Sequence, residues 1–465
     1  MKLQATHTAP SEPRALGVRI LTLLGVCVFV AGAVMPILLG AHFWLATLRW
    51  SGLAIIAAGG WRKSSLAYWI FFAMVLGGEI GLDWPQLGEH LRILSDIFLR
   101  LITVIVAPLI LGTLITGIAG HGNLRSVGRI GVKSLVYFEA VTTIALAIGL
   151  GAINLSRAGV GVAMVSTAGQ GVASAASLRW DDFLLHVFPE NIAKSIAENQ
   201  ILQVAVFAVL FGIALGRLSE SKRAPMMRFC ESLTETMFSL TNLVMYFAPV
   251  GVGAAMAYTV GHLGIGALLP LGKLLLTGYA ALAGFLLFVL LPIAWFARLP
   301  IARFLRAVAE PATIAFATSS SGAALPRAME EMEAFGVPRN IVAFVIPAGY
   351  SFNLDGSTLY LALASVFVAQ VAGIHMSWLQ QLFMVFTLML TSKGVAGVPR
   401  AVLVVLLATA GTFHLPTEPI FMILGIDALM DMGRTAVNVI GNCLACAVIA
   451  RWEGELVTAS PSPLP

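Results

Sequence analysis

Five polar residues recur at helical spacing within the last apolar segment of the sequence. They are Asp427, Asp431, Arg434, Asn438 and Asn442, and successive members are separated by 4, 3, 4 and 4 residues. This spacing places them on one face of a helix. If the three charged members faced lipid, their insertion would cost on the order of 8–10 kcal/mol. The pattern therefore predicts a polar stripe that faces the interior of a helical bundle.

The charges of this stripe indicate what it binds. Together with Asp355, the stripe has more carboxylates than guanidinium groups, so a fully ionised site would attract cations. Arg434 presents a planar fork suited to a carboxylate, and Asp431 suits an ammonium group. A substrate that carries both groups, such as an acidic amino acid, satisfies both residues. The structural alternative is an internal ion pair between Asp431 and Arg434, which leaves Asp355 and Asp427 unexplained.

Composition decides where such a stripe must lie. Of the 465 residues, 58% are apolar and 11% are charged, whereas soluble proteins have about 25% charged residues. Apolar runs long enough to cross a bilayer recur along the chain, and they are continuous rather than alternating. The fold class predicted is an all-α polytopic membrane protein. The net charge of +5 does not indicate nucleic-acid binding, because basic residues of membrane proteins gather in cytoplasmic loops.

Basic clusters near residues 62–63, 125–133, 217–228 and 298–306 predict the topology, because such loops face the cytoplasm. Six spans are expected near 65–80, 97–119, 134–154, 200–216, 231–257 and 269–297, with short loops at 81–90 and 259–268. Apolar runs at 16–40 and 44–60 predict one or two extra N-terminal helices, the alternative for the first being a cleaved signal peptide. Both termini are then expected in the cytoplasm.

The pattern changes after residue 300. The segment 301–340 is broken by Ser319–Pro326, 341–373 by Asn353–Ser357, and 377–413 by Thr391–Pro399, while 420–449 is continuous. This predicts a re-entrant hairpin, a broken span, a second hairpin and a last span, a pattern typical of a transport site at mid-membrane. The division expected is an N-terminal extension over 1–64, six spans over 65–300, a transport core over 301–455 and a tail over 456–465.

The two predicted hairpin tips have different chemistry. Ser319–Gly322 offers hydroxyl groups and amides beside a helix N-terminus, which suits a carboxylate. Gly394, Gly397 and Pro399 allow the second tip to fold tightly and to move as a gate.

These motifs resemble those of the dicarboxylate/amino acid:cation symporters, the glutamate transporter family. The resemblance covers about residues 65–455 and is carried by Ser319–Pro326, Asn353–Ser357, Gly394–Pro399 and Asp427–Asn442. It implies eight core transmembrane helices with two re-entrant hairpins, a homotrimer, and a transport domain that moves as an elevator. It also implies a multi-pass protein of the bacterial inner (plasma) membrane, with no cofactor beyond the coupling ions H⁺ and/or Na⁺.

The resemblance also implies residue roles. The substrate site would consist of Ser320, Ser321, Ser357, Val398, Asp431, Arg434, Thr435 and Asn438. Within it, Asp431 would bind the α-amino group, Arg434 the side-chain carboxylate and Ser321 the α-carboxylate. The cation sites would consist of Thr142, Thr143, Gly349, Asn353, Asp355, Asp427, Asn438 and Asn442, with Na⁺ at Asp355 and Asn353.

The sequence departs from the family pattern at four places. Position 442 is Asn where strongly sodium-coupled members carry Asp, which predicts a weaker second cation site. Glu139 lies in an apolar span and is a candidate proton relay, the alternative being a paired structural carboxylate. Arg400 and Val402 stand where many members have small residues. The first 60 residues lie outside the usual core.

Other functions fit less well. A C4-dicarboxylate symporter is the alternative substrate class, although Asp431 would repel a diacid. A neutral amino acid would not need Arg434. An intramembrane protease would need a Gly-x-Ser-x-Gly or Gly-x-Gly-Asp context, and neither surrounds these residues. A receptor would not require paired hairpins. The protein is therefore expected to be a transporter and not an enzyme.

Overall fold

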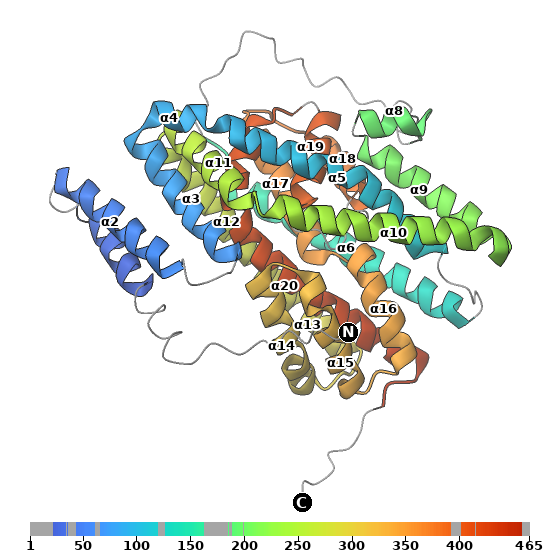
Figure 1. The fold of residues 1–465 in the computed structure, drawn as a ribbon. Coiled ribbons are helices and arrows are strands. Elements are labelled where there is room, and N and C mark those ends of the chain that lie inside the picture. The colour runs from blue at the N-terminus through green and yellow to red at the C-terminus, as the bar shows by residue number, and fades with distance from the viewer. Residues whose placement is uncertain are drawn as a thin grey trace, which may run out of the picture.

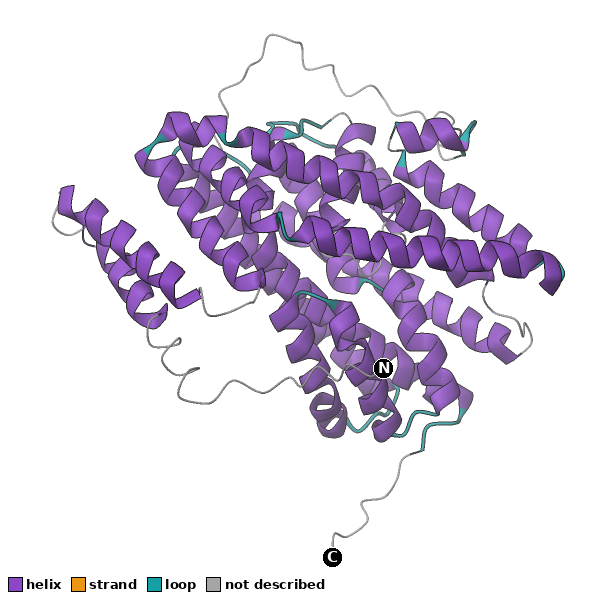
Figure 2. Cartoon of the chain, viewed as in Figure 1, coloured by secondary structure: helices purple, strands orange, loops and turns teal. Residues whose placement is uncertain are grey.

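The computed structural model describes residues 22–33, 35, 43–60, 66–119, 126–161, 185, 188–198, 200–391, 401–413 and 415–457. These residues form helices joined by turns and loops, without a strand among them (Figure 1, Figure 2). Six of the helical segments are long and apolar enough to cross a membrane, and a bent pair makes a seventh. The architecture is that of a multi-pass membrane protein, as the composition predicts.

Most helices of the first half follow the predicted spans, but the single span predicted at 231–257 is divided between two helices. They are α2 (Phe43–Gly60), α3 (Leu66–Asp83), α4 (Pro85–His90), α5 (Arg92–Ala119), α6 (Ser126–Ser156), α8 (Ile192–Ala197), α9 (Ile201–Gly216), α10 (Glu220–Met245) and α11 (Ala248–Leu263). The loop predicted at 81–90 is wrong, because the chain leaves the helix only at Trp84 and α4 begins directly at Pro85. Proline suits the first position of a helix, where its missing N–H costs nothing. Helices α10 and α11 form the bent pair, at 53°.

The helices of the second half include the predicted interruptions at Ser319 and Asn353, whereas the one predicted at Thr391–Pro399 lies almost wholly outside the described residues. They are α12 (Leu268–Phe285), a π-helical turn (Leu286–Leu290), α13 (Leu291–Phe296), α14 (Ile301–Thr318), α15 (Ser321–Phe335), α16 (Arg339–Phe352), α17 (Asp355–Val371), α18 (Trp378–Thr391), α19 (Ala401–Thr412) and α20 (Glu418–Glu453). The first interruption is shorter than predicted. Ser319 has a left-handed backbone (φ 50°) and ends α14, but α15 continues through Pro326.

The most buried helices form the centre of the bundle. In the segment Arg339–Val371, 94% of the most apolar stretch of 18 residues is buried inside the protein, and in α20 the corresponding fraction is 83%. The corresponding fraction for α3 is only 22%. Helix α20 packs against α11, α12, α14, α15, α16 and α17, and it runs through the middle of the bundle (Figure 1). Charged residues on α20 are thereby shielded from lipid.

Glycine residues bring α3 and α11 into backbone contact. A Cβ atom at Gly77 would lie 2.0 Å from the carbonyl oxygen of Gly253, and one at Gly81 would lie 2.4 Å from that of Ala257. Small residues allow such close approach between membrane helices, where van der Waals packing is a main source of stability. The pair α3–α11 is therefore a tightly packed unit on the side of the bundle away from α14 and α15 (Figure 1).

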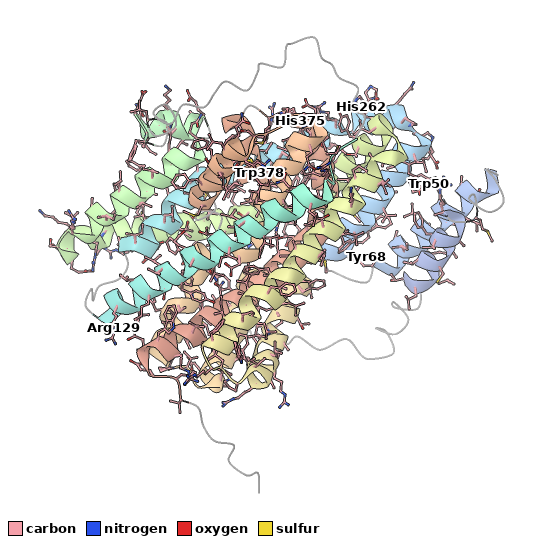
Figure 3. The ribbon with its side chains drawn as sticks, turned by 180° about the vertical axis from the view of Figure 1, so that it is seen from behind. Trp50, Tyr68, Arg129, His262, His375 and Trp378 are labelled. Carbon is pink, nitrogen blue, oxygen red and sulfur yellow. The ribbon has the colours of Figure 1, made fainter. Side chains whose placement is uncertain are left out.

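An N-terminal helical hairpin lies beside α3. It consists of Thr22–Ala33 and α2, and neither helix is among the six candidate spans. Arg49 of α2 pairs with Glu79 (2.7 Å) and Asp83 (2.8 Å), and the Trp50 indole donates to Asp83. The Tyr68 hydroxyl donates to the carbonyl of Ile56 near the opposite end of α2. Polar contacts at both ends thus hold the hairpin against the first core helix, and Figure 3 labels Trp50 and Tyr68 at this junction.

We expect Gly77→Ala to destabilise the protein by about 1–3 kcal/mol, because the added methyl group has no space between α3 and α11. Thermal unfolding of the purified protein in detergent measures the effect. The neighbouring variant Gly78→Ala is the control, since its methyl group would meet only Met256 Cγ at 3.7 Å. Equal unfolding temperatures for the two variants would contradict the close packing.

Candidate functional site

The polar stripe of α20 is buried, as its spacing predicts. Asp427, Asp431, Arg434, Asn438 and Asn442 are between 0% and 5% exposed. Each of them contacts polar groups of α17, of the break before α17, or of α20 itself. The stripe is therefore one side of an internal polar site between two helices.

Arg434 lies between two carboxylates. Its Nη1 atom is 3.1 Å from Asp427 Oδ1, and its Nε atom is 2.9 Å from Asp431 Oδ1. Asp431 Oδ1 also accepts a hydrogen bond from the Thr435 hydroxyl at 3.3 Å. Two polar atoms of this triad, Arg434 Nη2 and Asp427 Oδ2, are buried without a hydrogen-bond partner among the described residues. Buried groups of this kind normally have partners, so the triad has capacity left for a ligand or water.

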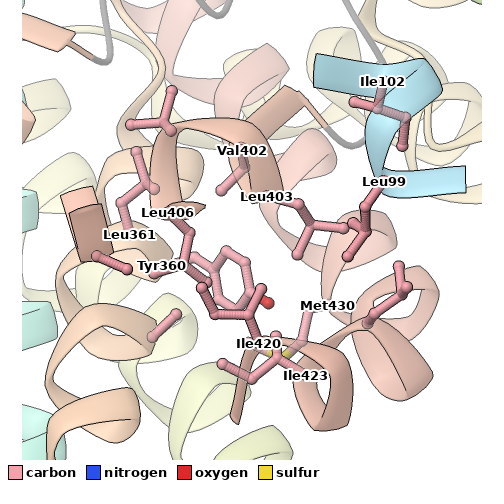
Figure 4. Close-up of a cluster of buried hydrophobic side chains, with 14 of the residues drawn as sticks. Leu99, Ile102, Tyr360, Leu361, Val402, Leu403, Leu406, Ile420, Ile423 and Met430 are labelled. Atoms are coloured by element: carbon pink, nitrogen blue, oxygen red, sulfur yellow. The ribbon is translucent and has the colours of Figure 1, made fainter. Parts of the chain in front are cut away.

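Tyr360 of α17 contacts two members of the triad and was not predicted from the sequence. Its hydroxyl donates to Asp427 Oδ1 at 3.3 Å, and the Arg434 guanidinium lies 4.8 Å from its ring centre. The ring stands among buried apolar side chains of α5, α19 and α20, including Leu403 and Met430 (Figure 4). The available signal was a tyrosine within an apolar segment, because a buried tyrosine hydroxyl usually has a polar partner.

Asn438 joins α20 to the start of α17. Its Oδ1 atom accepts hydrogen bonds from the backbone N–H groups of Gly356 (2.8 Å) and Ser357 (3.2 Å), and its Nδ2 atom donates to Ser357 Oγ (2.9 Å). The first N–H groups of a helix lack partners within that helix. The Asn438 side chain therefore satisfies donors that the break before α17 exposes. A Cβ atom at Gly356 would lie 2.4 Å from the Arg434 carbonyl, so only glycine permits this approach.

The break between α16 and α17 carries a second polar cluster. Asn353 donates through Nδ2 to Asp355 Oδ2 (3.2 Å) and to Asn442 Oδ1 (3.0 Å), and all three residues are buried. Asn353 Oδ1 and Asn442 Nδ2 have no hydrogen-bond partner among the described residues. Gly349 lies against Asn442, and Gly441 lies against Asp355 Oδ2. Oxygen atoms suit a hard cation, whereas the Asn442 Nδ2 donor does not.

Thr142 of α6 lies at the level of this break. Gly131 of α6 is next to Phe344 of α16, and farther along the same helix Gly149 is next to Leu359 of α17. Helix α6 therefore runs parallel to α16 and α17, and Thr142 lies between the two contact points. The Thr142 hydroxyl is buried without a partner among the described residues. It is thus a third oxygen available near Asn353.

Thr143 and Glu139 occupy a different side of α6. The Thr143 hydroxyl donates to the backbone carbonyl of Glu139 (2.7 Å), lies 3.4 Å from Met389 Sδ of α18, and belongs to an exposed residue. Glu139 is half-buried on the preceding turn. The structure thus separates the two threonines that the resemblance assigns to one cation site.

The serine turn between α14 and α15 is built as a helix start. Ser320 is the N-cap residue of α15, and its hydroxyl accepts a hydrogen bond from Ala323 N at 3.3 Å. The carbonyl of Ser321 accepts a hydrogen bond from the hydroxyl of Tyr350 on α16. Tyr350, like Tyr360, was not anticipated from the sequence. The contact fixes the turn against the helix that leads into the break.

Part of the predicted site lies outside the described residues. This applies to Val398 and to the gate residues Gly394, Gly397 and Pro399, together with Arg400. Val402 is described and is 3% exposed within the apolar cluster of Figure 4. At that position the larger side chain fills the core instead of facing the site.

A charged, buried stripe beside a broken helix in a multi-pass bundle is typical of a membrane transporter. Comparison with known proteins agrees. The profile of the sodium:dicarboxylate symporter family matches residues 66–452, and the chain belongs to this family. It is therefore a transport protein and not an enzyme.

Individual relatives are similar over most of both chains. The chain is 42% identical to a proton/sodium-glutamate symport protein of Geobacillus stearothermophilus, over 85% of this chain and 96% of the relative. It is 42% identical to a proton/glutamate-aspartate symporter of Escherichia coli (84% and 93%) and 42% identical to a C4-dicarboxylate transport protein of Solibacter usitatus (85% and 94%). Identity alone does not separate the two kinds of substrate.

We expect Asn438→Ala to lower the free energy of unfolding by about 2–4 kcal/mol, because it leaves two buried N–H groups of α17 without an acceptor. Ser357→Ala removes only the hydroxyl acceptor of the Asn438 amide and should cost about 1 kcal/mol. Thermal unfolding without substrate measures both. A cost for Asn438→Ala no larger than that for Ser357→Ala would show that the amide does not cap α17.

Proposed function

We propose that this protein is a secondary active symporter that takes up an acidic amino acid, aspartate or glutamate, together with cations. The observation that carries the proposal is the buried triad, in which one guanidinium nitrogen of Arg434 has no partner among the described residues and lies beside the Asp431 carboxylate. The free Nη2 atom suits the side-chain carboxylate of the substrate, and Asp431 suits its ammonium group. Two relatives at 42% identity bear names that include glutamate or aspartate transport.

The remaining substrate contacts follow from the surroundings of the triad. Ser320 and Ser321 would bind the α-carboxylate through the start of α15, where the helix dipole favours an anion. Ser357, Thr435 and Asn438 would supply hydrogen bonds, and Val398 would close over the ligand. In the structure Asp431 pairs with Arg434. Substrate entry would therefore replace an internal ion pair by two pairs with the ligand.

The coupling cations balance the charge of the loaded site. Asp355, Asp427 and Asp431 outnumber Arg434, and an acidic amino acid adds a further net negative charge. We assign one cation to Asp355, Asn353 and Thr142, because buried oxygens of Asn353 and Thr142 have no hydrogen-bond partner among the described residues and Asp355 supplies a buried carboxylate. The second group, Gly349, Asn438 and Asn442, would bind Na⁺ weakly, because position 442 supplies an amide and no carboxylate.

Glu139 is the proposed proton carrier. It is an ionisable residue within the apolar span Arg129–Ser156, one turn before Thr142 and Thr143. Ionisable residues at membrane depth are costly and commonly mark ion pathways. The relatives from Geobacillus stearothermophilus and Escherichia coli are both named as proton symporters.

The proposed architecture is the elevator type. Adding the bent pair α10–α11 and the shorter α9 to the six candidate spans gives eight core crossings, and α14–α15 and α18–α19 would be the re-entrant hairpins. Gly394, Gly397 and Pro399 would form the gate. We propose that both termini lie in the cytoplasm and that the protein is a homotrimer. Each subunit would be divided as predicted from the sequence, with residues 301–455 forming most of the mobile transport domain.

A C4-dicarboxylate symporter is the second candidate, because a relative with that name is equally identical. Asp431 distinguishes the two. A diacid would bring a second carboxylate toward Asp431, whereas an amino acid brings an ammonium group. Two carboxylates in contact inside a protein destabilise each other by several kcal/mol. This cost is on the order of the binding free energy of a weak ligand.

Uptake of radiolabelled aspartate into proteoliposomes, under separately imposed sodium and proton gradients, tests the symport. We expect uptake to depend on at least one gradient and to be competed by glutamate better than by succinate or serine. Uptake that ignores both gradients would exclude symport. Stronger competition by succinate than by glutamate would show that the substrate is a C4-dicarboxylate.

Arg434→Cys should reduce uptake of acidic substrates at least ~30-fold, because a buried charge partner of the substrate is lost. Arg228→Cys, at an exposed position of α10, is the matched control and should leave uptake unchanged. Unchanged uptake by a well-folded Arg434→Cys protein would refute the assigned role.

Glu139→Gln should remove the dependence of uptake on the proton gradient and leave aspartate binding largely intact. The control is Glu235→Gln, which changes an exposed carboxylate of α10. Proton dependence that survives in Glu139→Gln would make this residue a structural carboxylate.

A further inference from the structure

A cavity of about 370 Å³ lies where α6 ends, α11 ends and α12 begins. Its walls include Ala158, Val160, Leu263, Leu269 and Pro270, and one side chain, Lys273, brings a charge to it. Among the described residues, no acidic side chain lines it. The cavity is therefore apolar with a single positive corner, and it is separate from the polar site of α20.

Lys273 is placed at the depth of lipid headgroups. It is the only charged residue in the span Ile265–Phe296, which is 32 residues long. A helix of this length measures about 48 Å and extends roughly 9 Å beyond each side of a 30 Å bilayer core. Lys273 lies about 12 Å from the beginning of the span, close to the border between acyl chains and headgroups.

The backbone of a second cationic residue, Arg157, lies next to Lys273. The Lys273 ammonium lies 3.5 Å from the backbone carbonyl of Arg157, which follows the end of α6. Arg157 has a left-handed backbone (φ 49°), a conformation that costs energy for a residue with a side chain, and its side chain is exposed. The turn thus brings the backbone of Arg157 next to Lys273 and leaves the arginine side chain exposed.

The surface around the cavity faces acyl chains. Large apolar side chains there are strongly exposed, namely Leu155 (88%), Val160 (60%), Ile265 (59%) and Leu269 (79%). An apolar surface of this kind is covered by lipid in a membrane. The occupant of the cavity must therefore combine apolar chains with an anionic group at the level of Lys273.

We propose that this cavity binds one anionic phospholipid, with its phosphate at Lys273 and Arg157 and an acyl chain against Val160 and Leu269. Basic pockets between membrane helices are suited to lipid headgroups. The structural alternative is that Lys273 only caps α6 through the Arg157 carbonyl. That contact uses one of the three donors of the ammonium and does not account for the cavity.

Native mass spectrometry of the full-length protein in detergent, titrated with phosphatidylglycerol or phosphatidylcholine, tests the site. The wild type should bind phosphatidylglycerol more tightly. Lys273→Gln, which keeps a donor for the Arg157 carbonyl but removes the charge, should weaken that binding about fivefold, and adding Arg157→Gln should weaken it roughly 30-fold in total. Excess inorganic phosphate should not displace the lipid, because the acyl chain contributes to binding.

Lys194→Gln is the matched control, because Lys194 is an exposed lysine of α8 away from the cavity. Photoactivatable phosphatidylglycerol bound to the wild type should label residues 155–161 and 263–276, which tests the site even if a variant fails to fold. Equal binding of the two lipids, unchanged affinity in the double variant, displacement by phosphate, or labelling elsewhere would each overturn the proposal.

Discussion

The interaction on which the structure depends is the ion triad of Asp427, Asp431 and Arg434 on α20. One guanidinium lies between two carboxylates, and all three side chains are at most 7% exposed. Removing charges from water is costly, and a buried pair that loses one partner leaves an uncompensated charge. Protein must therefore surround α20, and nine of the described α-helices contact it. The burial of α17 and the Tyr360 ring over Arg434 follow from the same requirement.

The break at Asn353 is possible because α20 supplies partners for it. Non-helical backbone at membrane depth is tolerated only where it is buried in protein or lines a wet cavity. Here Asn438 satisfies the first N–H groups of α17, and Asn442 pairs with Asn353. The stripe therefore has two structural tasks besides binding, which are to neutralise Arg434 and to complete an interrupted helix. The same side chains that stabilise the fold are those that a substrate or cation would contact.

In the N-terminal hairpin, at the edge of the bundle, a charge on an apolar helix is likewise paired with opposite charges. Arg49 lies on an otherwise apolar helix and finds Glu79 and Asp83 on α3. Because the family match begins at residue 66, this contact joins a segment outside the family match to the first helix within it. The tight glycine contacts between α3 and α11 make α3 a firm surface for the hairpin.

The sequence by itself determined the helical class, the position of most helices and the burial of the stripe. These follow from local rules, since apolar run length fixes a span and a spacing of three or four residues fixes a face. It also located the breaks at Ser319 and Asn353, because serine, asparagine and glycine interrupt apolar runs. It failed at 81–90, where two helices meet at Trp84 and Pro85 without the loop that a drop in apolarity suggested.

Only the tertiary structure decided which residues meet. Tyr360 and Tyr350 come from apolar-looking segments, and no periodicity marks them as partners of Asp427 and of the serine turn. Thr142 and Thr143 are neighbours in sequence, yet the Thr142 hydroxyl is buried and the Thr143 hydroxyl lies against Met389 of α18, because successive residues of a helix lie about 100° apart. The internal pairing of Arg434 with both aspartates likewise depends on side-chain geometry in three dimensions, which helical spacing permits but does not fix.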